Sequence, residues 1–224
     1  MIGLTAFLCG FLIPAVAGRV MKVWYFDAGT ALARMVYLPK ITVKKRSLKV
    51  IFYRLVFSCL WGLAAVGFVR VAAVPSAFGI AFFCMLGVLL VVDSRIEILP
   101  DMITLPLLIL GFLFGAVVRG APLDSAYGAI LGYCIPLLSS FVVYPFRKEA
   151  MGGGDIKMMA ACGAWLGAAG LLIMVFLSLF VFAAQAIALR KRQFAYGPAI
   201  SLSALITLAF QESPLFGLIS SYLL

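Results

Sequence analysis

Residues 75–93 read PSAFGIAFFCMLGVLLVVD, an apolar run of membrane-spanning length that ends at a carboxylate, Asp93. About 20 consecutive apolar residues form a helix long enough to cross the hydrocarbon core of a bilayer. Such runs recur along all 224 residues, of which 65% are hydrophobic and 12% are charged. The sequence therefore predicts an all-α, polytopic transmembrane helical bundle and excludes an ordinary soluble domain.

About eight membrane segments are expected in this bundle. They are predicted at residues 2–18, 51–71, 75–92, 103–119, 124–146, 156–169, 170–189 and 197–211, before a short apolar tail to residue 224. No low-complexity segment or long linker separates them, so residues 1–224 are expected to form a single membrane domain.

Glycines four residues apart allow two helices to approach closely. We interpret these spacings as packing seams within the chain rather than dimer interfaces, and the oligomeric state stays open. The three spacings are Gly111/Gly115, Gly128/Gly132 and Gly163/Gly167.

The formal net charge of +10 follows a membrane-protein pattern. Threading the segments alternately through the bilayer places nearly all Lys and Arg on one side, and loops rich in these residues face the cytoplasm. The cytoplasmic loops are then residues 19–50, 93–102, 147–155 and 190–196. The basic loop at about 19–50 interleaves its charges with aromatic residues and is expected to lie along the lipid surface. Nothing resembles a nucleic-acid fold, so no nucleic-acid partner is expected.

Metal sites and histidine chemistry are not supported by the composition. The chain has no His, and its five Cys are scattered through apolar segments without a CxxC pair. Structural zinc sites need clustered Cys or His ligands. Acid–base chemistry in this chain must therefore rest on carboxylates, Lys or Tyr.

Acidic residues are few, and five of the eight fall in the loops 93–102 and 147–155. Two predicted helices separate these loops as an out-and-back hairpin, which returns both loops to the same side of the membrane. Asp93 and Asp155 are therefore expected to face each other at one membrane level. Asp155 follows Gly152-Gly153-Gly154, where the lack of side chains allows tight bending and close backbone approach.

Ionisable residues at membrane depth are costly and usually mark function. Two carboxylates about 3 Å apart share one proton and can activate water against a peptide carbonyl. The spacing alone leaves three interpretations open: aspartic-protease catalysis, proton or ion transport, and a structural or helix-capping role.

Two longer motifs resemble the signatures of prepilin peptidases, the type IV leader peptidase family of GxGD-type membrane aspartic proteases. The first is Asp93-Ser94-Arg95-Ile96-Glu97-Ile98-Leu99-Pro100-Asp101 with the following Met102 to Leu108, and the second is Glu149 to Lys157 running into Gly163-Ala164-Trp165-Leu166-Gly167. Tyr196-Gly197-Pro198 resembles a later landmark of the family. The likeness covers roughly residues 75–200 in the right order.

The resemblance implies that Asp93 and Asp155 are the catalytic aspartates. It implies that Gly152, Gly153 and Gly154 shape the loop that delivers Asp155. Three further residues match positions of the family motifs near the two aspartates. The resemblance implies that Asp101 supports the loop or contacts the substrate. It implies that Lys157 and Glu149 form salt bridges or position the loop.

The implied substrates are type IV prepilins or related pseudopilins, whose short basic leaders are cut at the cytoplasmic face of the bacterial inner membrane. No cofactor is implied for the peptidase reaction. Many family members carry two CxxC pairs after the first helix and methylate the new N-terminus with S-adenosylmethionine. Residues 19–50 contain no Cys, so the chain looks like a short form without the zinc domain, and methylation stays open. The alternatives are a small proton-coupled membrane transporter and a non-catalytic pilus assembly scaffold.

Overall fold

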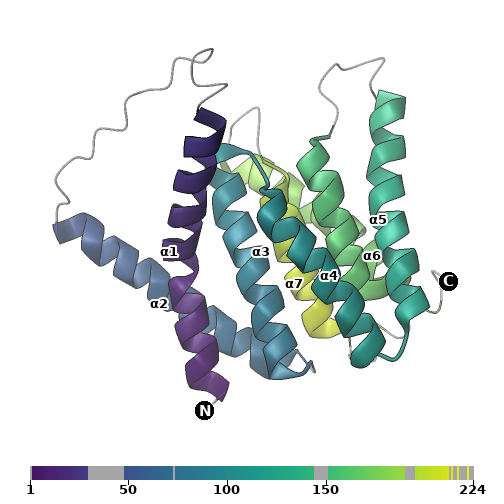
Figure 1. Ribbon diagram of the computed structural model, residues 1–224, viewed down its shortest axis with the longest axis horizontal. Helices are drawn as coiled ribbons and strands as arrows, with labels where there is room; N and C mark the ends of the chain where they lie inside the picture. The colour runs from purple at the N-terminus through teal and green to yellow at the C-terminus, as the bar shows by residue number, and fades with distance from the viewer. Residues whose placement is uncertain are drawn as a thin grey trace.

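The computed structural model of this protein is a bundle of α-helices (Figure 1). It describes residues 2–29, 48–72, 74–143, 151–189 and 195–211, together with residues 213, 216 and 221. Within these ranges the secondary structure is helical, without strands. The elements are α1 (Ile2–Gly29), α2 (Leu48–Val71), α3 (Ser76–Ile96), α4 (Asp101–Val117), α5 (Pro122–Val143), α6 (Gly153–Leu189) and α7 (Gly197–Phe210).

Four of the described helices contain stretches long and apolar enough to cross a membrane. These stretches are Ile2–Met21, Ser76–Ile96, Pro122–Val142 and Gly153–Ile187. Three shorter apolar helices, Leu55–Val71, Asp101–Val117 and Gly197–Phe210, accompany them. The predicted class, an all-α polytopic membrane protein, is therefore confirmed.

Two helices continue beyond their predicted ends. α1 continues to Gly29, into the segment predicted as a basic loop. α3 continues to Ile96, so Asp93 lies in the last helical turns rather than in a loop. An acid is tolerated there because the structure supplies a hydrogen-bond donor to its carboxylate, as described below. Helix α3 stops at Glu97, whose φ of 54° is left-handed, and Pro100 precedes the first residue of α4.

Helix α6 is two helical runs joined at Gly167, where φ is 74° and ψ is −178°. This conformation requires glycine. A continuous helix would separate Asp155 from Ser178 by about 35 Å. Ser178 nevertheless hydrogen-bonds to Tyr196, whose neighbour Gly197 hydrogen-bonds to Asp93. The segment after Asp93 in turn pairs with Lys157, two residues after Asp155. The chain therefore reverses at Gly167, and the two predicted helices at 156–169 and 170–189 are confirmed.

Polar side chains from the α4–α5 connection, the start of α5 and the residue after α7 satisfy the backbone groups that this reversal frees. The Asp124 carboxylate at the start of α5 accepts a hydrogen bond from the Ala168 N–H over 3.0 Å. Arg119 pairs with Asp124 at 2.6 Å and donates to the Trp165 carbonyl over 3.3 Å. Gln211, at the end of α7, donates to the Leu166 carbonyl over 3.1 Å. Unsatisfied backbone groups in an apolar bundle cost several kcal/mol each, which explains this polar cluster.

The core is built around α3, which lies between α1 and α4 with α7 behind it (Figure 1). Trp165 of α6 is fully buried; its ring packs against Phe82 of α3 and Phe114 of α4. Its indole N–H donates to the Leu107 carbonyl over 2.7 Å. One side chain thus joins α3, α4 and the first run of α6, the helix that carries Asp155.

The glycine spacings form seams inside the chain, as predicted. A Cβ on Gly128 or Gly163 would overlap the backbone of the other helix, so α5 and the first run of α6 are in backbone contact. A Cβ on Gly132 would lie 2.5 Å from the Met159 carbonyl oxygen, and one on Gly111 would lie 2.7 Å from the Trp165 ring. These contacts hold the first run of α6 between α4 and α5.

Candidate active site

Asp93 lies near the end of α3 with only 3% of its surface exposed. The backbone N–H of Gly197, the first residue of α7, donates a hydrogen bond to Asp93 Oδ2 over 2.9 Å. A Cβ on Gly197 would overlap this carboxylate, so glycine is needed for the approach. A buried carboxylate needs such a donor, because a charged group left without one carries a desolvation cost of several kcal/mol.

Asp155 lies in the first turn of α6. Its N–H donates to the Gly152 carbonyl over 3.0 Å and closes the turn that starts the helix. An acid is favoured in this position because the N-terminal end of a helix carries a partial positive charge.

The three glycines before Asp155 differ in how closely other atoms approach them. In the described part of the chain positive φ among glycines is confined to Gly120 and Gly167, so Gly152, Gly153 and Gly154 have φ values that other residues also adopt. Close approach does hold for Gly154, where a Cβ would lie 2.9 Å from Leu99 Cβ. A Cβ on Gly153 would meet nothing within 4 Å, and one on Gly152 would lie 3.4 Å from Asp155 Oδ2.

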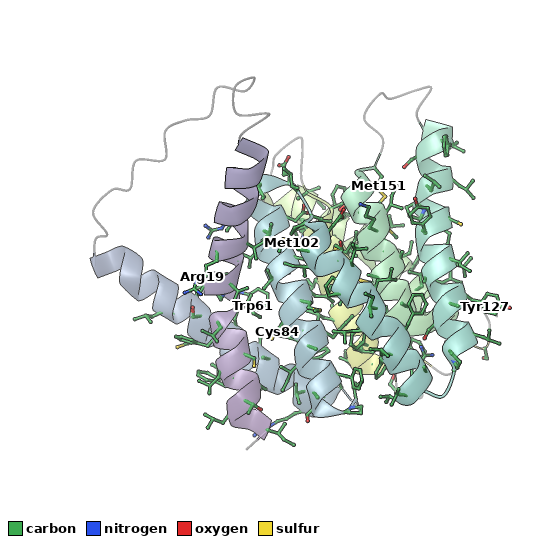
Figure 2. The ribbon with its side chains drawn as sticks, in the orientation of Figure 1. Arg19, Trp61, Cys84, Met102, Tyr127 and Met151 are labelled. Carbon is green, nitrogen blue, oxygen red and sulfur yellow. The ribbon has the colours of Figure 1, made fainter. Side chains whose placement is uncertain are left out.

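The two aspartates lie on segments that are joined by an ion pair, because Asp101, eight residues after Asp93, pairs with Lys157, two residues after Asp155. They reach this arrangement from elements far apart in the sequence, the end of α3 and the start of α6. Met102 and Met151, which belong to the two signature stretches, lie toward the same end of the bundle (Figure 2). The predicted convergence of the two stretches is therefore present in the fold.

Asp101 and Lys157, two of the predicted supporting residues, form an ion pair. Lys157 Nζ lies 2.9 Å from Asp101 Oδ1 and 2.7 Å from Oδ2. Both side chains are about half exposed, at 47% and 49%. The third predicted supporting residue, Glu149, lies outside the described residues.

Tyr196 and Gly197 were noticed in the sequence only as a family landmark, and the structure brings both to the aspartates. The Ser178 hydroxyl donates to the Val175 carbonyl over 2.7 Å. Its single proton is then committed, so the Tyr196 hydroxyl donates to Ser178 Oγ. Burial raises the pKa of Tyr196, which keeps this hydroxyl protonated at neutral pH. The spacing of the motifs in the sequence does not predict the contact between Tyr196 and Ser178.

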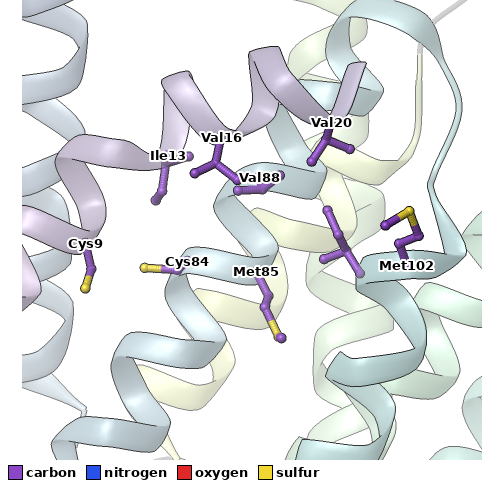
Figure 3. Close-up of a pocket in the computed structure, with 9 residues that line it drawn as sticks. Cys9, Ile13, Val16, Val20, Cys84, Met85, Val88 and Met102 are labelled. Atoms are coloured by element: carbon purple, nitrogen blue, oxygen red, sulfur yellow. The ribbon is translucent and has the colours of Figure 1, made fainter. Parts of the chain in front are cut away.

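An apolar cavity of about 260 Å³ lies between α1, α3 and the start of α4. Side chains from α1 and α3 converge on it, and the thiols of Cys9 and Cys84 point toward each other (Figure 3). Asp93 lies on the opposite face of α3 from Cys84, because nine residues at 100° each amount to half a turn beyond two full turns. Among the described residues, no group of three or more His, Cys, Asp or Glu side chains is placed to hold a metal ion.

Comparison with known proteins agrees with this arrangement. Residues 80–187 match the type IV leader peptidase family. A prepilin leader peptidase/N-methyltransferase of Escherichia coli (strain K12) is 31% identical over 217 residues, which cover 92% of this chain and 93% of that protein.

Two further relatives carry the same name. The protein of Neisseria gonorrhoeae is 39% identical over 127 residues, and that of Klebsiella pneumoniae is 38% identical over 104 residues. These matches cover 54% and 45% of this chain, and 44% and 45% of the two relatives, so the matched region is less than half of each relative. No solved structure matches the chain.

Proposed function

Because this chain belongs to the type IV leader peptidase family, we propose that it is a membrane aspartic endopeptidase whose catalytic carboxylates are Asp93 and Asp155. The substrates are type IV prepilins or related pseudopilins, and the cut removes their short basic leader at the cytoplasmic face of the bacterial inner membrane. One observation carries the proposal: a nearly fully buried Asp93, held by the Gly197 N–H, is followed by a segment whose Asp101 pairs with Lys157, two residues after Asp155.

The reaction follows from two carboxyl groups that share one proton. The ionised group removes a proton from water as the water oxygen attacks the scissile carbonyl carbon. The protonated group gives its proton to the carbonyl oxygen, which forms a tetrahedral diol. The diol collapses as the amine nitrogen accepts a proton and the C–N bond breaks, which leaves a new carboxyl end on the leader and a new amino end on the pilin. The pair titrates as a unit, so neither step is assigned to one aspartate alone.

The names of these relatives also include N-methylation, for which we propose no site in this chain. A nucleoside and an amino-acid group need several hydrogen-bonding partners, whereas the cavity between α1, α3 and α4 is lined by apolar and sulfur-containing side chains. We derive no methyl-transfer step. The short-form interpretation, without a zinc domain, rests on the absence of Cys from residues 19–50.

A co-expression assay tests the peptidase. The chain is produced with a candidate prepilin, and leader removal is followed by gel shift and by mass spectrometry of the mature N-terminus. Asp93→Asn and Asp155→Asn keep the shape of the side chain and remove its acid–base function. Each is expected to lower the cleavage rate by at least about 100-fold while the protein still accumulates in the membrane.

Arg70→Gln is the control, because it removes an exposed charge at the end of α2, outside both signature stretches. It is expected to cleave at nearly the wild-type rate. Full processing by either Asn variant would falsify the assignment of the two aspartates. The mass of the new N-terminus reports in the same experiment whether a methyl group is added.

A further inference from the structure

The connection between α3 and α4 docks on the first turns of α6 at two points. Leu99 is buried and fills the space that a side chain on Gly154 would take, at 2.9 Å from the Cβ position. Two residues later Asp101 holds Lys157 through both carboxylate oxygens. We call these two contacts, Leu99–Gly154 and Asp101–Lys157, the clasp.

The clasp joins the segment that follows Asp93 to the segment that contains Asp155. Leu99 and Asp101 follow Asp93 on the continuous run from the end of α3 into α4. On the other side of the clasp, Gly154 directly precedes Asp155, and Lys157 follows it by two residues. A shift of the start of α6 away from the connection that follows α3 would therefore stretch at least one of these two contacts.

We propose that the Asp101–Lys157 ion pair is a positioning element that sets the relative placement of Asp93 and Asp155. This inference rests on the proposed peptidase function and adds to it the residues that hold the catalytic pair in register. Two carboxylates share a proton only at short range, and a displacement of about 1 Å in a catalytic constellation costs on the order of 100-fold in rate.

The energetics of the pair fit positioning better than stability. Ion pairs that are about half exposed contribute only about 0–1 kcal/mol to folding, because water screens them. Removing Asp101 or Lys157 is therefore expected to leave the fold intact and to alter the geometry of the first turn of α6. The apolar half of the clasp, Leu99 on Gly154, stays in place in such variants.

A different role for Asp101 makes a different prediction. If Asp101 instead binds a basic residue of the leader, Lys157 is only its resting partner. In that case the loss of Asp101 weakens substrate binding, and the loss of Lys157 does not. Exchanging the two charges distinguishes the roles, because the exchange restores an ion pair and leaves a cation where the leader would need a carboxylate.

Kinetics of purified protein with a prepilin provide the first measurement. Asp101→Asn and Lys157→Met are each expected to lower kcat by about 10- to 100-fold with KM within about twofold of wild type. The double exchange Asp101→Lys with Lys157→Asp is expected to recover most of kcat. Arg70→Gln, which changes the net charge by the same amount as Lys157→Met and lies at the end of α2, is expected to leave kcat within about twofold.

Cross-linking provides a measurement that does not depend on activity. In a background without the five natural Cys, Asp93→Cys and Asp155→Cys are joined by a short bifunctional thiol reagent. Adding Asp101→Asn is expected to slow this cross-link several-fold, and adding the double exchange is expected to restore it.

The outcomes separate the two proposals. Wild-type cleavage with unchanged kcat in both single variants overturns the positioning role and leaves the peptidase function standing. In Asp101→Asn, a rise in KM that is larger for leaders of greater positive charge, and that the double exchange fails to reverse, overturns the positioning role. It would favour leader binding by Asp101. Absence of cleavage by wild type refutes the peptidase function, and an unaltered cross-link in Asp101→Asn then refutes the positioning role separately.

Discussion

The backbone N–H of Gly197 donates a hydrogen bond to Asp93 Oδ2 over 2.9 Å and joins the start of α7 to the end of α3. The contact depends on a missing side chain, because a Cβ on Gly197 would overlap the carboxylate. Pro198 follows directly, and its fixed φ favours the start of a helix. The two residues together bring a backbone donor to a buried acid, so no polar side chain is needed as the donor.

Gly197→Ala is therefore expected to displace the Asp93 carboxylate and to lower leader cleavage by about 100-fold or more. The same change at Gly79 of α3 is the control, because its Cβ would meet Val69 and Phe68 only at ordinary contact distances of 3.8 and 3.9 Å. Cleavage by Gly197→Ala at a rate similar to that of Gly79→Ala would show that the hydrogen bond does not set the position of Asp93.

Gly153 and Gly154 allow a second test, since they are neighbours with different surroundings. Gly154→Ala pushes a methyl group against Leu99 Cβ at 2.9 Å and is expected to lower cleavage by at least about tenfold. Gly153→Ala meets nothing within 4 Å and is expected to cleave like wild type. The combination of Gly154→Ala with Leu99→Gly removes the clash and is expected to recover part of the lost rate. Equal loss in the two alanine variants would mean that backbone flexibility, rather than close approach, is what the stretch requires.

The reversal at Gly167 sets up a prediction about stability. Asp124→Ala removes the acceptor for the Ala168 N–H and the partner of Arg119, and it is expected to lower the free energy of unfolding by about 1–3 kcal/mol. Gly167→Ala is expected to cost more, because its φ of 74° disfavours a side chain and the added Cβ would overlap the Asp124 carboxylate.

Thermal unfolding in detergent measures both changes at the Gly167 reversal. Gly67→Ala is the control, because a Cβ there meets nothing within 4 Å. A melting temperature for Asp124→Ala equal to that of the control would mean that water satisfies the freed backbone groups instead.

The sequence allowed much of this fold to be predicted, and the reasons are physical. Apolar runs must form helices in a bilayer, so the segments and the pairing of the 93–102 and 147–155 stretches follow from hydropathy and topology. The exact end of α3 does not follow, because an acid at the end of an apolar run is typical of a loop. Its place in the helix depends on a donor from residue 197, a contact across the bundle that no local pattern records. The polar cluster at Gly167 was missed for the same reason, since Arg119, Asp124 and Gln211 come from separate elements.

The orientation of the bundle provides the last prediction. Lys and Arg concentrate in the loops on the side of Asp93 and Asp155, so this side is expected to face the cytoplasm, with the Arg119–Asp124 end outside. Ser94, exposed beside Asp93, and Val118, exposed before Arg119, mark the two ends. The test uses intact spheroplasts of cells that produce this protein without its natural Cys. A membrane-impermeant maleimide is expected to label Val118→Cys in them. Ser94→Cys is expected to react only after the cells are opened. Labelling of Ser94→Cys in intact cells would place the two aspartates on the outer face, and a leader cut in the cytoplasm would then be untenable.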